Sequence, residues 1–199
     1  MKPKEIGKAY DEITHLWERE EFNRDNGILA HQKALTFVNE PGSALDVGCG
    51  CTGRFIDLLL DSGFQPEGVD ISLKMLEIAK TRHPEITFHL QDICQWTVPK
   101  KYHFITAWDS IWHVPLSQQL ELLKKLFASL KKGGVCVFSA GGVSEAGEHE
   151  NNAMGPKVYY SSLGVNGFLK VIMESGCQLK HFEFDQYPEL HTYYIVQKD

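Results

Sequence analysis

The glycine-rich stretch from Leu45 to Phe55, LDVGCGCTGRF, constrains the fold of this chain more than any other segment. Gly48, Gly50 and Gly53 follow a short apolar run in a G-x-G-x-x-G spacing. Such a turn between a strand and a helix lets the backbone approach a ligand closely and directs helix N–H groups toward it. The stretch therefore predicts a strand, a nucleotide-type binding loop and a helix, which is typical of an α/β sheet.

Strand and helix patterns alternate downstream of the glycine loop. Short apolar runs predict strands at residues 44–47, 67–70, 86–90, 104–108 and 135–138. Helical stripes lie between most of them, and Ser72 is placed to cap the second helix. Two further strands, around 182–184 and 193–196, lack the crossover that a parallel return needs, so we expect them to be antiparallel. The pattern predicts a three-layer α/β fold around a seven-stranded sheet, mostly parallel with an antiparallel last strand.

Composition narrows the classes of function. The 199 residues are 43% hydrophobic and carry a net charge of −6, which argues against a broad nucleic-acid surface. The five cysteines are scattered without a C-x-x-C spacing, so we expect reduced thiols and no metal site. The charged N-terminus and the absence of a membrane-length apolar window favour a cytoplasmic protein that contacts no membrane. The oligomeric state stays open.

We expect a single domain over residues 1–199, with an N-terminal helical cap over residues 1–40 and the sheet-based core over residues 41–199. The cap contains apolar residues at helical spacing. Two interpretations remain open for it. Either the cap is a lid that turns Tyr10 or Trp17 toward the ligand, or these side chains are ordinary core.

Acidic residues after the strands indicate which ligand the loop binds. Asp46 would place a carboxylate beside a pyrophosphate, whereas a cationic ligand removes that conflict. S-adenosylmethionine, which carries an ammonium and a sulfonium, is such a ligand. Asp70 ends the second strand, where a carboxylate accepts from the ribose hydroxyls of an adenosine or a dinucleotide alike. After the third strand, Asp92 is placed to accept from an adenine amine while a neighbouring backbone N–H donates to the ring.

Five motifs occur in a fixed order: LDVGCGCTGRF, GVDISLKMLEIA, FHLQDI, FITAWDSIWHV and LKKGGVCVFS. Through them the chain resembles the class I S-adenosylmethionine-dependent methyltransferases over roughly residues 41 to 140. The resemblance implies a Rossmann-like fold with the cofactor over the carboxyl ends of the strands. Two departures stand out, an extra residue in the glycine loop at Cys51-Thr52 and His103 where the family commonly has an aspartate.

The expected cofactor-binding residues match these motifs. They are Asp46, Gly48, Cys49, Gly50, Gly53, Asp70, Ile71, Gln91, Asp92, Ile93 and Trp108. Arg54 either reaches the methionine carboxylate of the cofactor or is solvated. Ile71 either packs on adenine or belongs to the core.

The segment AWDSIWHVPL lies where this fold brings the cofactor methyl and the acceptor together. Asp109 and His113 are the candidate catalytic residues, because a carboxylate or an imidazole can accept a proton from the acceptor. Trp112 is a candidate for stacking on a planar or cationic substrate. For His113, simple packing is the alternative.

Residues 139–164 are predicted to form a long polar loop, and such loops often act as lids over a site. His149, Tyr159 and Tyr160 are the candidate substrate contacts in it, with a solvated surface excursion as the alternative. Near the C-terminus, Asp185, Glu189 and His191 flank a turn, and we expect a solvated hairpin there. No ligand spacing supports a metal site between these residues and His149.

The sequence thus predicts an S-adenosylmethionine-dependent methyltransferase whose partner is a small-molecule acceptor. It lacks the N/D-P-P-Y and Pro-Cys signatures of nucleic-acid methylating enzymes and has no basic appendage. A non-catalytic S-adenosylmethionine-binding or partner-binding module on the same fold is the first alternative, because fold alone does not establish function. An NAD-dependent oxidoreductase is the second.

Overall fold

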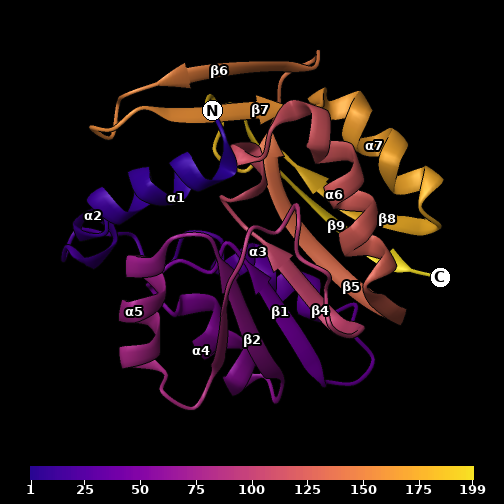
Figure 1. Cartoon of the computed structure of the whole chain (residues 1–199). Helices are drawn as coiled ribbons and strands as arrows, with labels where there is room; N and C mark the ends of the chain where they lie inside the picture. The colour runs from indigo at the N-terminus through magenta and orange to yellow at the C-terminus, as the bar shows by residue number, and fades with distance from the viewer.

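A seven-stranded sheet forms the centre of the protein, described over residues 1–199 by a computed structural model (Figure 1). Its strands are β1 (Ser43–Val47), β2 (Gln65–Asp70), β3 (Thr87–Leu90), β4 (Tyr102–Ala107), β5 (Leu130–Gly141), β8 (Cys177–Glu183) and β9 (His191–Lys198). They are ordered β3-β2-β1-β4-β5-β9-β8. Strand β9 alone is antiparallel to its neighbours β5 and β8. The predicted sheet, with its reversed last strand, is confirmed.

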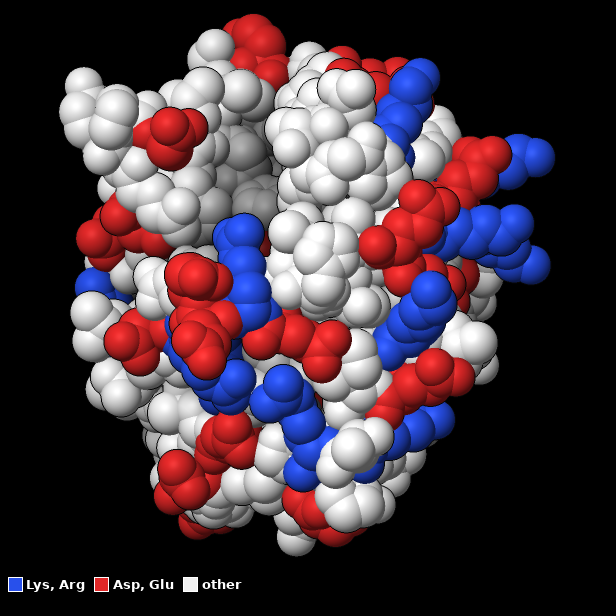
Figure 2. Space-filling model, turned by 90° about the vertical axis from the view of Figure 1, so that its left-hand side faces the viewer, with Lys and Arg blue, Asp and Glu red and all other residues white.

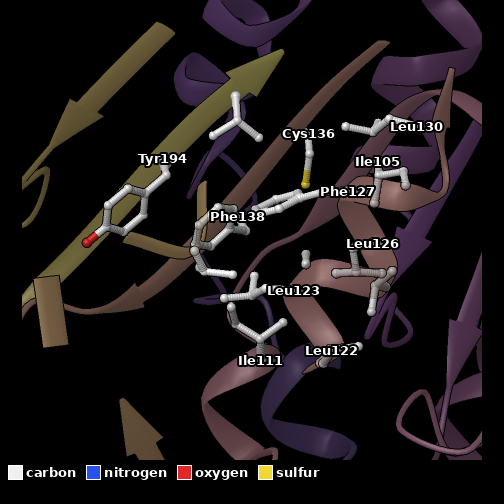
Figure 3. Packing of buried hydrophobic residues seen from close by; sticks show 14 of the residues in the cluster. Ile105, Ile111, Leu122, Leu123, Leu126, Phe127, Leu130, Cys136, Phe138 and Tyr194 are labelled. Atoms are coloured by element: carbon white, nitrogen blue, oxygen red, sulfur yellow. The ribbon is translucent and has the colours of Figure 1, made fainter. Parts of the chain in front are cut away.

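Helices cover both faces of this sheet and confirm the three-layer arrangement. They are α3 (Ile28–Leu35), α4 (Arg54–Asp61), α5 (Leu73–Arg82), α6 (Leu116–Ala128) and α7 (Gly164–Glu174). On one face, α6 and α7 pack on β4, β5 and β9 through an apolar cluster that includes Phe127 and Phe138 (Figure 3). On the other face, α3 and α4 contribute Ala34 and Leu59 to a cluster around Phe104.

Local sequence signals set several of these boundaries. The Ser72 hydroxyl accepts from the Met75 backbone N–H at 3.2 Å and starts α5, which confirms the predicted cap. Helix α6 ends at Ala128, earlier than its apolar stripe predicts. The reason is that Leu130 already pairs with Tyr102 of β4, so β5 begins there.

The N-terminal stripe forms two short helices, α1 (Pro3–Glu12) and α2 (His15–Glu18), rather than one. Helix α1 lies between α5 and the outer hairpin (Figure 1). It approaches the end of β2 closely, because a Cβ on Gly7 would lie 2.7 Å from the carbonyl oxygen of Ile71. The Asp11 carboxylate adds a second link by accepting from the Ser72 hydroxyl at 2.6 Å and from the Lys74 N–H at 3.0 Å.

The prediction of a structureless loop over residues 139–164 is wrong. Strand β5 continues to Gly141, and β6 (Gly147–Asn151) and β7 (Val158–Ser162) then form a separate antiparallel pair. Every residue of β6 is exposed, so its sequence GEHEN lacks the apolar alternation by which a strand is recognised. In β7 four of the five residues are buried, and they tie the hairpin to the rest of the molecule.

The molecular surface carries both signs of charge. On the face shown in Figure 2, acidic and basic side chains intermingle and no large area of one sign stands out. A recess in the same view is bordered mainly by residues other than Lys, Arg, Asp and Glu. No helix of the protein is both long enough and apolar enough to span a membrane.

Candidate active site

A cavity of about 290 Å³ lies over the carboxyl ends of the parallel strands. Its wall includes Val47 at the end of β1, Asp70 at the end of β2 and Trp108 directly after β4. Pro3, Ile6 and Tyr10 of α1 form part of the opposite wall. This volume is near the lower end of the range for small-molecule sites, about 300–1,000 Å³.

The glycine loop shapes one end of this cavity. Gly48 and Gly50 adopt φ angles of 70° and 56°, which favour glycine. A Cβ on Gly48 would lie 2.3 Å from the Cβ of Ser110, whereas one on Gly50 would meet nothing within 4 Å. The loop therefore packs tightly on its inner side and leaves open space above Gly50. Gly53 does not line the cavity and instead precedes α4, with φ 71°.

Two carboxylates follow the neighbouring strands on the same wall. Asp70 accepts from the backbone N–H of Gly50 at 2.9 Å and of Ser72 at 2.8 Å. Burial raises its pKa, and these N–H donors oppose the rise. Asp92 accepts from the Cys94 N–H at 2.9 Å and lines the cavity.

The other residues of this wall suit an adenosine-type ligand. Apolar and polar side chains from the ends of the same strands lie beside the two carboxylates, namely Cys49, Ile71, Gln91 and Ile93. Acceptors for hydroxyl and amino groups thus sit next to flat apolar surface and open space at Gly50. The residues present therefore fit S-adenosylmethionine.

Asp46 is buried beneath the loop and is not part of the cavity wall, in contrast to the predicted contact. Burial raises the pKa of its carboxyl to about 7, and the nearby Arg54 opposes that rise. A carboxyl in this position acts on a ligand through its charge rather than by contact. Arg54 itself lines the cavity and donates to the Asn26 carbonyl at 3.1 Å and to the Thr52 hydroxyl at 3.1 Å.

His113 lies at the far end of the cavity in the short helix η1 (Ile111–His113), with both ring nitrogens engaged. Its Nδ1 is 2.8 Å from the Tyr159 carbonyl. Its Nε2 is 2.6 Å from the Tyr10 hydroxyl and 2.9 Å from the Trp112 indole N–H. The contacts fit the tautomer protonated on Nδ1, whose Nε2 accepts from both donors. Burial lowers the pKa of His113 to about 4, so the ring is neutral near pH 7.

Asp109, the other candidate catalytic residue, also lines the cavity and is held by three polar side chains. Ser139 Oγ accepts from its backbone N–H at 2.7 Å and donates to its Oδ1 at 3.2 Å. Asn26 Nδ2 donates to Oδ2 at 3.0 Å, and His191 Nε2 lies 3.1 Å from Oδ1. Asp109 is also the one non-glycine residue with a positive φ, 51°.

A family model described as "Methyltransferase domain" matches residues 19–162 of this chain. The chain belongs to this methyltransferase family. Among curated relatives, the chain is 31% identical over 128 residues to the dTDP-3-amino-3,6-dideoxy-α-D-glucopyranose N,N-dimethyltransferase of Streptomyces fradiae, covering 63% of this chain and 48% of that one. It is 32% identical over 95 residues to the trans-aconitate 2-methyltransferase of Rhizobium meliloti, covering 47% and 36%. The chain spans at most about half the length of these relatives.

Solved structures have the same fold as this chain. An S-adenosylmethionine-dependent methyltransferase from Clostridium acetobutylicum matches 96% of this chain and 99% of its own, with a TM-score of 0.74 and 14% identity. The magnesium protoporphyrin IX methyltransferase of Synechocystis, solved with S-adenosylmethionine, matches 100% and 98%, with a TM-score of 0.71 and 19% identity. The resemblance to the class I S-adenosylmethionine-dependent methyltransferases is confirmed.

The predicted substrate contacts divide into two groups. Trp112 and Tyr160 line the cavity, whereas His149 and Tyr159 do not. His149 is exposed on β6 and stacks on Tyr160, with ring centroids 5.2 Å apart. The Tyr159 hydroxyl accepts from the Leu116 N–H at 2.9 Å and donates to Glu148 at 2.6 Å, so it holds the hairpin onto the start of α6.

His191 is the main residue of the candidate site that the sequence interpretation missed. The prediction of a solvated hairpin is wrong for it, because its side chain is only 8% exposed and lies between Asp109 and Asp185. Its Nδ1 is 2.5 Å from Asp185 Oδ1. The sequence did contain a signal for His191, because the first residue of a reversed last strand lies at the carboxyl edge of the parallel strands. No three His, Cys, Asp or Glu side chains are placed to hold a metal ion.

Buried polar atoms without partners also mark the cavity. Trp108 Nε1 and Ser110 Oγ make no hydrogen bond, although both residues line the wall. Buried polar groups are nearly always satisfied in folded proteins. Both atoms lie against the backbone behind the wall, since a Cβ on Gly27 would be 2.9 Å from Trp108 Nε1 and one on Gly48 would be 3.0 Å from Ser110 Oγ. The sequence predicted Trp108 as a site residue but gave no separate signal for Ser110.

Proposed function

We propose that this protein transfers a methyl group from S-adenosylmethionine to a small-molecule acceptor. The observation that carries the proposal is one continuous cavity lined both by the glycine loop, Asp70 and Asp92 and by Asp109, Trp112 and His113. The names of the curated relatives, a sugar N,N-dimethyltransferase and a trans-aconitate methyltransferase, support a small acceptor. The bound cofactor supplies an electrophilic methyl group, and the protein positions and desolvates the acceptor.

The residues of the cavity wall indicate how the cofactor would be held. Asp70 accepts from the ribose hydroxyls, and Asp92 accepts from the adenine amine between Ile71 and Ile93. The open space at Gly50 admits the middle of the ligand. Arg54 binds the methionine carboxylate, because it is the one Lys or Arg side chain on the cavity wall. Gly53 and Asp46 support the loop from outside the cavity.

The acceptor end assigns different roles to the two candidate catalytic residues. Asp109 contacts the acceptor. His113 is a positioning residue, because its Nε2 already accepts from Tyr10 and Trp112. Residues 1–40 act as a cap, since α1 contributes Pro3, Ile6 and Tyr10 to the wall. The five unpaired cysteines favour a cytoplasmic location.

The test combines binding with turnover. Calorimetry with S-adenosylmethionine, its demethylated product and NAD identifies the cofactor, and methyl-labelled cofactor incubated with a metabolite extract reports transfer. We expect Asp70→Ala to weaken cofactor binding roughly 10- to 100-fold, the effect of losing charged hydrogen bonds of about 1.5–3 kcal/mol. Asp61→Ala, an exposed carboxylate at the end of α4, is the matched control.

Each of the remaining outcomes would contradict the proposal in a different way. Tight binding of NAD and none of S-adenosylmethionine would identify an oxidoreductase. Binding of S-adenosylmethionine without label transfer to any metabolite would identify a non-catalytic module. Transfer that persists unchanged in Asp70→Ala would contradict the assigned cofactor end.

A further inference from the structure

We propose that the methyl acceptor is an amine, bound by Asp109, and that His191 and Asp185 hold the Asp109 carboxylate in place. The inference rests on the proposed function and adds the acceptor atom to it. It comes from the hydrogen-bonded chain Asp109–His191–Asp185, in which the buried His191 joins two partly exposed carboxylates and which the cofactor end of the cavity does not use. In sequence order the three residues come from the end of β4, the loop before β9 and the first position of β9.

The Asp109 carboxylate retains one free acceptor position. An ionised carboxylate offers about four lone-pair sites. Oδ1 uses two of them, for Ser139 Oγ and His191 Nε2, and Oδ2 uses one, for Asn26 Nδ2. The remaining position on Oδ2 suits a donor such as an N–H of the acceptor, because Asp109 lines the cavity.

The backbone of Asp109 is held in a strained conformation. Its φ of 51° lies in the left-handed region, which costs a residue other than glycine free energy. The N–H···Oγ bond to Ser139 keeps it there. Such strain persists only where the surroundings enforce it, and here it fixes the direction of the one carboxylate at the acceptor end.

The charge of the chain complements a cation. His191 contacts a carboxylate through each ring nitrogen, so the ring carries both protons and a positive charge. Burial lowers the pKa of His191, but the hydrogen bonds to Asp109 and Asp185 outweigh it, and the net change is upward. Two carboxylates and one imidazolium carry one net negative charge, and Arg54, which shares Asn26 with Asp109, is the proposed partner of the methionine carboxylate. Trp108 and Trp112, whose rings lie 5.3 and 5.7 Å from that of His191, add aromatic faces that attract cations.

The cavity wall is less suited to a carboxylate or a hydroxyl acceptor. A carboxylate acceptor needs a cation, yet Arg54 is the sole Lys or Arg on the wall, beside the glycine loop and Asn26. A hydroxyl acceptor must lose its proton to a base during the reaction. The two imidazoles near Asp109 are committed, since His113 Nε2 accepts two bonds and His191 lies between two carboxylates, which leaves the Asp109 carboxylate as the one base for a hydroxyl.

An amine needs no base for the transfer itself. A neutral amine donates N–H to Asp109 Oδ2 and keeps its lone pair for the reaction. That lone pair forms the N–C bond, while the C–S bond breaks and its electrons stay on sulfur. The positive charge thus moves from sulfur to nitrogen, and the Asp109 carboxylate stabilises it as it develops. The product ammonium then releases a proton to water.

The first experiment identifies the acceptor atom. The full chain is incubated with methyl-labelled S-adenosylmethionine and a metabolite extract, and the position of the label in each product is determined by mass spectrometry and NMR. We expect label on nitrogen. Label on a hydroxyl or carboxylate oxygen would overturn this inference and leave the proposed function intact. No labelled product, with cofactor binding preserved, would overturn the proposed function itself.

The second experiment uses the amine so identified. We expect Asp109→Asn to lower kcat about 100-fold, the effect of losing one preorganised electrostatic contact, with the cofactor Kd unchanged. Unchanged kcat in this variant would overturn the inference. His191→Gln leaves Asp109 in place and should raise the acceptor KM as well as lower kcat. Glu189→Gln, exposed in the same loop, is the control and should change neither.

A purely structural role for His191 predicts a different pattern. It would lower the melting temperature and weaken cofactor and acceptor binding alike. Cofactor affinity reduced as much as acceptor affinity would therefore count against a positioning role. Cofactor affinity preserved beside an altered acceptor KM would support it.

Discussion

Asp46 couples a proton to the binding of a cationic ligand. Burial raises the pKa of its carboxyl to about 7, so the side chain is largely protonated below that pH in the free protein. A sulfonium and an ammonium nearby favour the ionised form and lower this pKa. At pH 6 we therefore expect the binding of S-adenosylmethionine to release a fraction of one proton.

Calorimetry in two buffers of different ionisation enthalpy measures this release. The demethylated product, which lacks the sulfonium charge, should release less. Asp46→Asn removes the titrating group and is the matched variant. Equal release from this variant and the natural protein would assign the proton to another residue.

At the scale of elements, α1 closes the cavity because it lies unusually close to the end of β2. A Cβ at Gly7 would lie 2.7 Å from a backbone oxygen, so Gly7→Ala forces the helix away from Ile71, at about 1–3 kcal/mol for overpacking. We expect faster hydrogen exchange in α1 and weaker cofactor binding. Lys8→Ala, exposed on the same helix, should change neither.

The direction of the change in hydrogen exchange distinguishes overpacking against Ile71 from a simple change in helix propensity. Alanine is favoured over glycine in a free helix by about 0.8–1 kcal/mol. A helix that made no tight contact would therefore become more protected from exchange after Gly7→Ala. Slower exchange in α1 would contradict its role in closing the cavity.

The β6–β7 hairpin depends on one tyrosine hydroxyl. Tyr159 accepts from the Leu116 N–H in the first turn of α6, and Tyr159→Phe leaves that donor without a protein partner. We expect the free energy of unfolding to fall by about 1–3 kcal/mol in urea denaturation. Tyr160→Phe is the matched control, because the Tyr160 ring packs on His113 and His149. A loss of the same size in both variants would show that the effect does not come from the bond between the Tyr159 hydroxyl and Leu116.

Sequence patterns predict the elements that are defined locally. The glycine loop, Asp70 and Asp92 follow directly from strand ends, and strand ends follow from apolar runs bounded by glycine or polar residues. Strand β6 escapes such reasoning, because all its residues are exposed and its sequence shows no apolar alternation. His191 escapes it because its partners Asp109 and Asp185 meet only after β9 has paired with β5.

For the whole molecule, two buried histidines make the stability depend on pH in opposite directions. His31 is bonded to the Gly27 carbonyl and Thr106, and burial lowers its pKa to about 3. As the pH falls through about 6.5, the unfolded chain binds a proton at this histidine and the native protein does not, so the free energy of unfolding decreases. His191 has a raised pKa, so its stabilising contribution is complete below about 6.5 and is lost as the pH rises.

The difference in unfolding free energy between the natural protein and each variant isolates the contribution of one histidine, since the other titrating groups are present in both proteins. Relative to His31→Gln, the natural protein should lose about 1.4 kcal/mol of unfolding free energy per pH unit below 6.5. Relative to His191→Gln, it should lose stability above 6.5. Urea denaturation from pH 4 to 9 gives both slopes. A pH-independent difference for either variant would contradict the protonation state assigned to that histidine.

The reversal of β9 has a consequence for how such a protein can diversify. In an all-parallel sheet the site is built only from segments that leave strands, and several of these also hold the cofactor. Strand β9 instead enters the sheet at that edge, so His191, bonded to Asp185, reaches Asp109 on a connection that contributes no residue to the cavity wall. Acceptor preference can therefore evolve, or be engineered, in this connection while the cofactor apparatus stays constant.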